Sequence, residues 1–387
     1  MRLVGSEMCI RDRSRSTFLS LKYTNIVKKL PSSVPFVGPE AQERSLEKEF
    51  SARIGANESV FGPSTKAALA MQNEVSSTWK YADPENYDLK LALAKKHRTK
   101  FENIIVGEGI DGLLGYLVRL FVEKGDNVVT TDGAYPTFNY HVAGFGGTLQ
   151  KVPFKNDKED LSQLLLKVNQ TSAKILYVSN PNNPMGTTNT QSSIEDLVRN
   201  LPKETLLCLD EAYADFLPHD QIPNISLNSE NVIRMRTFSK AYGMAGARIG
   251  YGIGSEGLIK NFDKVRNHFG MSRISQVGAL ASLHDNQFIQ DIVSKVKISI
   301  QKITEIAFKN NCKVISSSAN FIAIDCCRDQ IYAKKVLDNL ILQGVFVRMP
   351  YSSPQNRCIR VTAGLETDIK LFEKAFPIAL SRADKDC

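Results

Sequence analysis

Several features that assign proteins to common functional classes are missing from this chain of 387 residues. No apolar run approaches the length of about 18 residues that a membrane-spanning helix requires, so we expect no contact with a membrane. The seven cysteines include no Cys-x-x-Cys pair, and an odd number spread over so long a chain is typical of reduced thiols. We therefore expect a cytoplasmic protein without a metal site. Internal repeats and low-complexity linkers are absent as well.

Positive charge is scarce outside the N-terminus. The net charge is +8, but residues 1–30 hold seven lysines and arginines against two acidic residues, which leaves +3 for the rest of the chain. No basic stripe interleaved with aromatic residues appears there, so we expect no nucleic-acid partner. Residues 1–30 are rich in arginine and serine without an apolar core, which predicts a disordered or non-native tail.

The chain does contain enough apolar sequence for a large core and two domains. Apolar runs of strand length recur between helical patterns, at 103–106, 127–130, 175–179, 206–209 and 232–237. This alternation predicts an α/β fold built on a large, mostly parallel sheet.

The flanking segments complete the expected organisation. Residues 21–64 contain four prolines and predict an irregular arm, whereas the strands predicted after residue 310 are separated by a single helix, which indicates a smaller α+β unit. We therefore expect an N-terminal arm at 31–78 with small-domain and dimer contacts, a large domain at 79–285, and a small C-terminal domain at 286–387.

One lysine motif carries the most chemical information. Lys240 follows Ser239 in a run of small residues, and Arg248 lies eight positions further on. A lysine amine is a useful nucleophile when its neutral form is accessible, and hydroxyls with an arginine suit a bound phosphate. The motif therefore suggests a lysine in Schiff-base linkage to a phosphorylated aldehyde, pyridoxal phosphate. On the motif alone, a surface lysine in a turn is the alternative.

Three further polar segments directly follow predicted strands, where ligand sites of parallel sheets lie. Segment 107–111 is glycine-rich and leads into an apolar helix predicted at 113–122, so its amides could hold a phosphate. Segment 179–187 contains three asparagines and two prolines. Asp210 ends another strand, where a carboxylate could bind a protonated pyridine nitrogen. Taken singly, each segment is also compatible with an ordinary loop or a helix N-cap.

Together these segments resemble one family. The sequence reads Asn-Pro-Asn-Asn-Pro-x-Gly at 180–186, Asp-Glu-Ala-Tyr at 210–213, Ser-Lys-Ala-Tyr-Gly at 239–243 and Ile-Arg-Val-Thr at 359–362. In this order the motifs resemble the fold-type I pyridoxal-phosphate aminotransferases, and within them the histidinol-phosphate aminotransferase-like branch. The resemblance covers about residues 30–375. It implies a large domain with a sheet of the seven-stranded type and a smaller C-terminal domain.

The resemblance also implies a role for individual residues toward pyridoxal 5′-phosphate. Lys240 would carry the cofactor and move the proton, Asp210 would pair with the pyridine nitrogen, and Tyr213 would complete the catalytic set by binding the 3′-oxygen. The residues that it implies as further cofactor ligands are Asn183 at the 3′-oxygen, Phe138 stacked on the ring, and Thr237, Ser239, Arg248, Gly109, Ile110 and Asp111 at the phosphate. Tyr81 would reach the phosphate of a neighbouring subunit, which implies a homodimer with shared active sites.

The implied activity is ping-pong transfer of an amino group from a donor to a 2-oxo acid, with 2-oxoglutarate as the expected acceptor. Arg360 would bind the substrate carboxylate, and Arg348, Asn57 and Phe36 would line the substrate site. Phe36 stands where family members usually carry a tyrosine, so the donor stays open between histidinol phosphate and an aromatic or other amino acid. A same-fold lyase, such as an amino-acid phosphate decarboxylase, and a non-catalytic binding protein are the alternatives.

Overall fold

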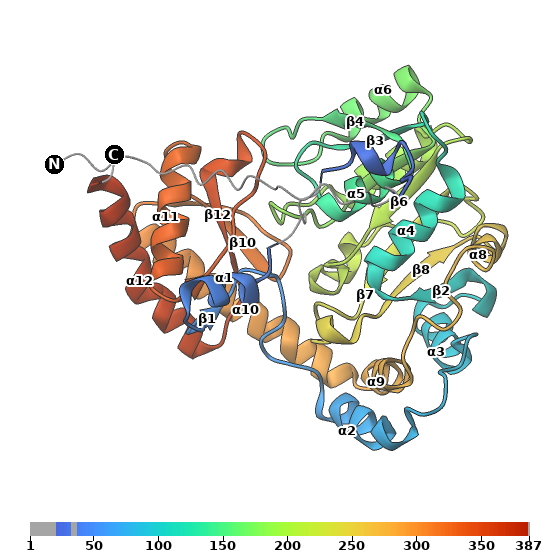
Figure 1. The fold of residues 1–387 in the computed structure, drawn as a ribbon, viewed down its shortest axis with the longest axis horizontal. Coiled ribbons are helices and arrows are strands. Elements are labelled where there is room, and N and C mark those ends of the chain that lie inside the picture. The colour runs from blue at the N-terminus through green and yellow to red at the C-terminus, as the bar shows by residue number, and fades with distance from the viewer. Residues whose placement is uncertain (1–20, 32–36, 386–387) are drawn as a thin grey trace.

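The computed structural model describes residues 21–31 and 37–385, and it has two lobes (Figure 1). The larger lobe is built on a seven-stranded sheet in the order β2-β8-β7-β6-β5-β3-β4. Its strands are β2 (Ile104–Gly107), β3 (Asn127–Thr131), β4 (Thr148–Val152), β5 (Ile175–Ser179), β6 (Leu206–Asp210), β7 (Val232–Thr237) and β8 (Gly250–Gly254). Only β8 runs against its neighbours, β2 and β7, so the predicted α/β fold with a mostly parallel sheet is confirmed.

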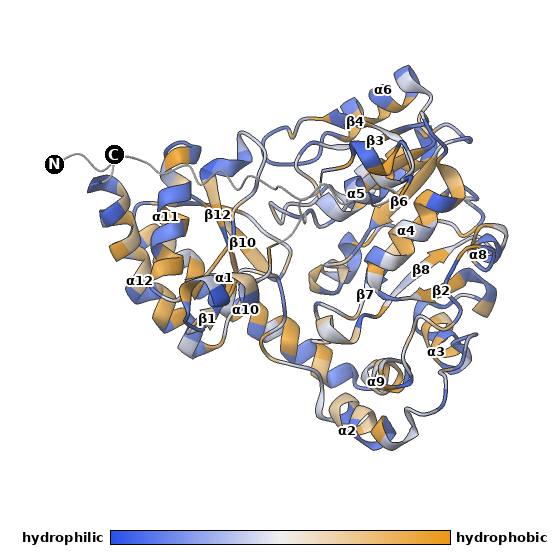
Figure 2. Cartoon of the chain, in the orientation of Figure 1, coloured by the Kyte–Doolittle hydropathy of each residue, from blue (hydrophilic) through white to orange (hydrophobic). Residues whose placement is uncertain are grey.

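Helices cover both faces of this sheet because successive residues of its buried strands point to opposite sides. In β5, Ile175 and Tyr177 pack with helices α4 and α5, whereas Leu176 and Val178 pack with α6 and α7. The helices of this lobe are α2 (Thr65–Glu74), α3 (Tyr87–His97), α4 (Gly109–Phe121), α5 (Pro136–Gly144), α6 (Leu161–Thr171), α7 (Gln191–Asn200), α8 (Glu256–Phe262) and α9 (Arg273–Leu283). Figure 2 shows the resulting hydrophobic interior along β6 and α4.

The smaller lobe contains a three-stranded antiparallel sheet in the order β12-β10-β9 and a two-stranded parallel pair of β1 and β11. Its strands are β1 (Ala52–Arg53), β9 (Lys313–Ile315), β10 (Phe321–Asp325), β11 (Val345–Phe346) and β12 (Cys358–Thr362). Its helices are α1 (Pro39–Leu46), α10 (Asn286–Lys309), α11 (Gln330–Leu342) and α12 (Glu366–Lys385). The N-terminal elements α1 and β1 therefore lie beside the C-terminal ones (Figure 1).

The structure corrects three details of the expected elements. The arm is not irregular throughout, because α1 begins at Pro39, whose fixed φ suits the first turn of a helix. Helix α4 begins at Gly109 rather than at Leu113, so the glycine-rich segment contributes the helix N-terminus itself. Strands β4 and β8 of the large sheet were not predicted. The domain boundaries at residues 30, 78 and 285 stay predictions, as does the tail, most of which lies outside the described residues.

The described part of the chain also bears on the predicted environment. None of its helices is long and apolar enough to cross a membrane. Its cysteines are free, and Cys208, Cys312, Cys326 and Cys358 are buried. Reduced thiols are compatible with the cytoplasmic location, which stays a prediction.

Candidate active site

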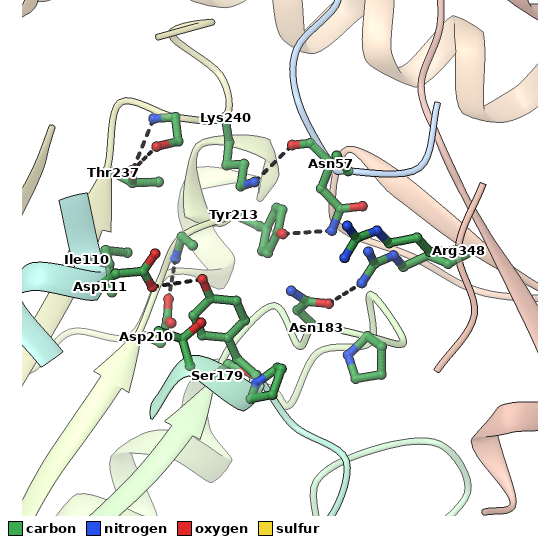
Figure 3. A pocket seen from close by; sticks show the side chains of 18 of the residues that line it. Asn57, Ile110, Asp111, Ser179, Asn183, Asp210, Tyr213, Thr237, Lys240 and Arg348 are labelled. Atoms are coloured by element: carbon green, nitrogen blue, oxygen red, sulfur yellow. Dashed lines mark hydrogen bonds between the residues drawn. The ribbon is translucent and has the colours of Figure 1, made fainter. Parts of the chain in front are cut away.

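The carboxyl ends of parallel strands meet one cavity of about 550 Å³ between the lobes. Strand β5 ends at Ser179, β6 at Asp210 and β7 at Thr237, and all three residues line this cavity (Figure 3). The cavity is also lined by most of the other residues predicted from the sequence: Asn57, Ile110, Asp111, Asn183, Tyr213, Ser239, Lys240, Arg248, Arg348 and Arg360. The fold therefore brings together motifs that lie up to about 300 positions apart in the chain.

The Lys240 amine points toward the N-terminal arm. Its Nζ donates a hydrogen bond of 2.9 Å to the Asn57 carbonyl oxygen (Figure 3). Burial and the positive charge of Arg360 lower the pKa of Lys240 to about 8. About a tenth of the amine is therefore neutral at pH 7, far more than for an ordinary lysine, and the neutral form is the one required of a nucleophile and a base. The surface-turn alternative does not hold, because Lys240 lines the cavity.

The loop that carries Lys240 is held by close backbone packing. Gly243 has φ +67°, and a Cβ atom there would collide with the Gly62 carbonyl group. Glycine is needed at 243 both for the left-handed backbone and for this approach of the N-terminal arm. The loop and the arm that supplies Asn57 are thus fixed against each other beside the Lys240 amine.

Asp210 is a buried carboxylate at the end of β6, 5% exposed. Its Oδ2 accepts a hydrogen bond of 2.6 Å from the Tyr177 hydroxyl, and its Oδ1 accepts one of 2.9 Å from the Ala212 amide. Burial raises the pKa of Asp210 to about 6, and the two hydrogen bonds oppose that rise. Asp210 is therefore mostly ionised at neutral pH and can pair with a protonated ring nitrogen.

An anion-binding corner lies where β7, β8 and the N-terminus of α4 meet. The Ser239 amide and the Thr237 Oγ1 are 3.0 Å apart, and the Arg248 Nη1 lies 3.5 Å from the Ser239 Oγ. Gly109 has φ +77°, and a Cβ atom there would approach the Arg248 Cζ to 3.0 Å. Free amides at a helix N-terminus, hydroxyls and a guanidinium together suit a phosphate group.

Two arginines line the same cavity, Arg360 from β12 and Arg348 from the segment that follows β11. Arg348 and Arg360 form an antiparallel backbone bridge. The Arg360 side chain donates to the Asn183 Oδ1 at 2.6 Å and to the Gly55 carbonyl at 3.2 Å, while its buried Nε has no partner among the described residues. Burial lowers the pKa of Arg360 to about 10, which leaves the guanidinium charged at neutral pH. Positive charge is thus concentrated at this part of the cavity.

Tyr213 and Asn57 connect these groups. The Tyr213 hydroxyl accepts a hydrogen bond of 2.9 Å from the Asn57 Nδ2, and burial raises the pKa of Tyr213 to about 12. Its ring lies 5.7 Å from the Lys240 Nζ. Tyr213 is therefore a neutral phenol at neutral pH, and the Tyr213 hydroxyl and the Lys240 amine both bond to Asn57.

The structure corrects the prediction for Phe138. This side chain is fully buried and packs on Tyr177 with ring centroids 4.5 Å apart. Because Phe138 has no exposed surface even with the cavity empty, it cannot contact a ligand there. Tyr135 lines the cavity instead and donates a hydrogen bond of 2.7 Å to the Asp111 Oδ1. Two residues separate the two aromatics, and helix α5, which begins at Pro136, turns only Phe138 of the two inward.

The remaining predicted residues lie elsewhere. Gly109 borders the anion-binding corner without lining the cavity, and Tyr81 is 80% exposed. Phe36 lies outside the described residues. Tyr177 and Tyr351 line the cavity but were not predicted. Tyr177 sits inside a buried strand, where its hydroxyl gives no sequence signal.

Comparison with known proteins agrees with this arrangement. The family model for aminotransferases of class I and II matches residues 53–372. The histidinol-phosphate aminotransferase of Moorella thermoacetica is 32% identical over 349 residues, which cover 88% of this chain and 89% of that protein. The solved histidinol-phosphate aminotransferase of Sinorhizobium meliloti, in complex with pyridoxal-5′-phosphate, is 46% identical with a TM-score of 0.91, and the match covers 95% of this chain and 100% of that one.

A lyase also shares the fold. The L-threonine-O-3-phosphate decarboxylase of Porphyromonas gingivalis superposes with a TM-score of 0.73 but is only 18% identical, over 85% of this chain and 99% of that one. That likeness shows the fold alone, so the lyase alternative is not favoured. The chain belongs to the class I and II aminotransferases, the pyridoxal-phosphate-dependent transaminases of fold type I.

Proposed function

We propose that this aminotransferase moves the amino group of histidinol phosphate to 2-oxoglutarate in a ping-pong reaction. The observation that carries the proposal is the pair of Arg348 and Arg360, which line the same cavity as Lys240. Ping-pong transfer uses one cavity for both substrates in turn. Histidinol phosphate and 2-oxoglutarate each bring two negative charges, so a shared arginine pair can bind either. The similarity to enzymes named histidinol-phosphate aminotransferases supports this choice.

We assign the cofactor contacts from the groups that surround the cavity. Ser239, Thr237, Arg248 and the first amides of α4 would bind the phosphate. Asp210 would pair with the pyridine nitrogen, while Asn183 and Tyr213 would bind the 3′-oxygen. The donor set fits the cofactor because it supplies an anion-binding corner, a buried carboxylate and an amine in one cavity.

Each residue then has a defined task. The bound cofactor supplies an electron sink that acidifies the Cα–H bond of the substrate. Lys240 takes the proton from the substrate Cα through its neutral Nζ, and the amine then donates the proton on the same face of the site. Asp210 keeps a positive charge on the ring nitrogen by remaining ionised. Arg360 orients the substrate through its guanidinium, and the Tyr213 hydroxyl bonds to Asn57, as the Lys240 amine does.

A donor screen tests the assignment. Purified holoenzyme is assayed with histidinol phosphate, phenylalanine and tyrosine as donors and 2-oxoglutarate as acceptor, with glutamate formation as the measurement. We expect the kcat/KM for histidinol phosphate to exceed that for either amino acid by at least about 100-fold, because a charge-paired phosphate is worth a few kcal/mol in a buried site. Equal or greater kcat/KM for phenylalanine would contradict the proposal, and release of carbon dioxide without glutamate would contradict transamination.

We also infer a homodimer in which Tyr81 serves the partner's site. Tyr81 is 80% exposed and does not line the cavity of its own chain, and its ring contacts Phe269 in a tilted arrangement with centroids 4.9 Å apart. Trp79 nearby is equally exposed, so this surface presents large aromatics to solvent.

Mixing inactive variants tests the shared site. We expect Tyr81→Ala and Lys240→Ala proteins, each of low activity, to regain about a quarter of normal activity on exchange of subunits, because one intact site forms in each mixed dimer. Sedimentation velocity measures the assembly. Full activity in a species of single-chain mass would contradict the dimer.

A further inference from the structure

Glu159 is a buried carboxyl group outside the cavity, and none of the predicted motifs includes it. It lies one residue before Asp160, the N-cap of α6, and is 3% exposed. No lysine, arginine or histidine in the described part of the chain forms a salt bridge with it. Burial, and to a lesser degree the charge of Asp210, raise the pKa of Glu159 to about 8. Burial of an ionisable group without a counter-ion lowers the stability of the folded state, so we looked to the contacts of Glu159 for a function.

The side-chain hydrogen bonds of Glu159 go to the last residue of β5 and to the segment that follows it. Its Oε1 accepts from the Asn182 Nδ2 at 2.7 Å and from the Ser179 Oγ at 3.3 Å. Its Oε2 accepts from the Ser179 amide at 3.2 Å. Three donors thus converge on two oxygens. A carboxyl group has two acceptor oxygens on one carbon, whereas a glutamine amide has one oxygen and one NH2 group. Glutamine therefore could not accept from all three donors.

This segment carries Asn183 into the cavity. It has no regular secondary structure between Ser179 and α7, so its shape depends on the individual hydrogen bonds within it. Asn182 holds the turn, since its Oδ1 accepts from the Met185 amide at 3.1 Å and its backbone pairs with Gly186 and Thr187. The next residue, Asn183, accepts a hydrogen bond of 2.6 Å from Arg360. Glu159 therefore holds Asn182, and the next residue, Asn183, bonds to Arg360 and lies at the assigned cofactor position.

The backbone around Glu159 is tied to the same segment. The Asn189 Nδ2 donates to the Glu159 carbonyl at 3.2 Å, and the Thr187 Oγ1 donates to the Asp157 carbonyl at 2.8 Å. The Asp157 carboxylate in turn forms a salt bridge of 2.8 Å with Arg357 in the smaller lobe. Residues 157–159 thus form a fixed support for the loop, independent of the cavity side chains.

We propose that Glu159 is a positioning residue for transamination, which holds the 179–187 loop so that Asn183 presents its amide to the cofactor and its oxygen to Arg360. The inference rests on the cofactor contact assigned to Asn183. It assigns Glu159 no contact with substrate or cofactor. Misplacement of a catalytic contact by about 1 Å lowers rates by up to about 100-fold, so loss of the support has a measurable cost.

Glu159→Ala tests the proposal by a readout that needs no amino donor. An amide that donates to the 3′-oxygen withdraws negative charge from the bound cofactor, so its loss raises the pH midpoint of the cofactor's absorbance change. We expect Glu159→Ala and Asn183→Ala to shift this midpoint upward in the holoenzyme, and Glu159→Ala to lower kcat by about 10- to 100-fold. Asp160→Ala is the matched control. It removes the 3.2 Å cap to the Gln163 amide of the same helix without touching the loop, and should leave the midpoint unchanged.

A double substitution separates positioning from general stability. Glu159 and Asn182 share a hydrogen bond and support the same loop, so we expect the double variant to shift the midpoint by less than the sum of the two single variants. Additive shifts would overturn the proposal, as would a Glu159→Ala midpoint equal to that of Asp160→Ala. An unchanged midpoint in Asn183→Ala would also overturn the proposal, because it would show that Asn183 does not contact the cofactor. This outcome does not depend on which amino donor the enzyme uses. If Glu159→Ala does not fold, Glu159→Gln decides: a smaller upward shift supports the proposal, and an unchanged midpoint overturns it.

Discussion

Lys240→Ala is expected to lower kcat/KM for transamination by at least about 10,000-fold, the upper range of what a positioned proton-transfer group contributes. The variant lacks the amine to which we assign the covalent link with the cofactor and the transfer of the substrate Cα proton. The Asn57 carbonyl that accepts from the Lys240 Nζ and the Tyr213 phenol, whose ring lies 5.7 Å from it, are not bases at neutral pH, so neither can replace the amine. Steady-state kinetics with the preferred donor measures the activity, and the absorbance of the lysine-bound cofactor shows whether the covalent bond to the cofactor is present.

Lys90→Ala provides the matched control. Burial lowers the pKa of Lys90 as it does that of Lys240, but the Lys90 Nζ packs over the Phe101 ring at 4.0 Å and not in the cavity. We expect this variant to keep normal activity and the normal spectrum. An unchanged absorbance spectrum in Lys240→Ala, or borohydride reduction that labels a different lysine in the unsubstituted enzyme, would show that the assignment of Lys240 is wrong.

Asp210→Asn is expected to lower kcat by about 1,000-fold, which corresponds to about 4 kcal/mol of transition-state stabilisation. Asparagine has nearly the same shape, and its oxygen can accept from the Ala212 amide while its NH2 group donates to the Tyr177 hydroxyl, so the loss isolates the negative charge. Because the pKa of Asp210 is raised to about 6, the carboxylate loses its charge as the pH falls through that value. The apoenzyme should accordingly bind pyridoxal phosphate more weakly below about pH 6 than above it.

The control for Asp210 is Asp196→Asn, on the exposed surface of α7, where a neutral substitution should leave kcat unchanged. Cofactor affinity is measured by fluorescence titration of the apoenzyme and kcat by glutamate formation. Activity of Asp210→Asn within about twofold of normal would remove Asp210 from the catalytic set.

The sequence predicted the central strands because each is a run of five or more residues buried on both faces of the sheet. It could not predict β8, in which glycines alternate with larger residues over Gly250–Gly254. Those glycines carry no strand signal, yet a Cβ at Gly250 would lie 2.5 Å from the Gly109 carbonyl carbon, so close packing demands them. Strand β4 was missed because it lies at the sheet edge with mixed exposure.

The candidate site could be predicted where a residue with suitable chemistry stands in a motif that directly follows a strand, as Lys240, Asp210 and Asn183 do. It was not predictable where a side chain acts across the sheet. Tyr177 and Glu159 belong to no motif, and their hydrogen bonds to Asp210 and Asn182 arise only when separate segments pack together. Phe138 was predicted at the site and does not line the cavity. The start of helix α5 decides that Tyr135, and not Phe138, faces the cavity.

Two backbone hydrogen bonds, of 2.6 and 3.2 Å, join Arg348 to Arg360. Their main chains cannot move apart without breaking β pairing, so both side chains start from fixed backbone positions. Hydrogen bonds from Arg348 to the Val37 carbonyl and from Arg360 to Asn183 and the Gly55 carbonyl then hold the two guanidinium groups. A new donor preference cannot be reached by sliding either arginine. It has to come from cavity residues such as Met349 and Tyr351, whose side chains can change size while both anion-binding points stay in place. The substrate range of this enzyme can therefore change through substitution of uncharged cavity residues while both arginines are kept.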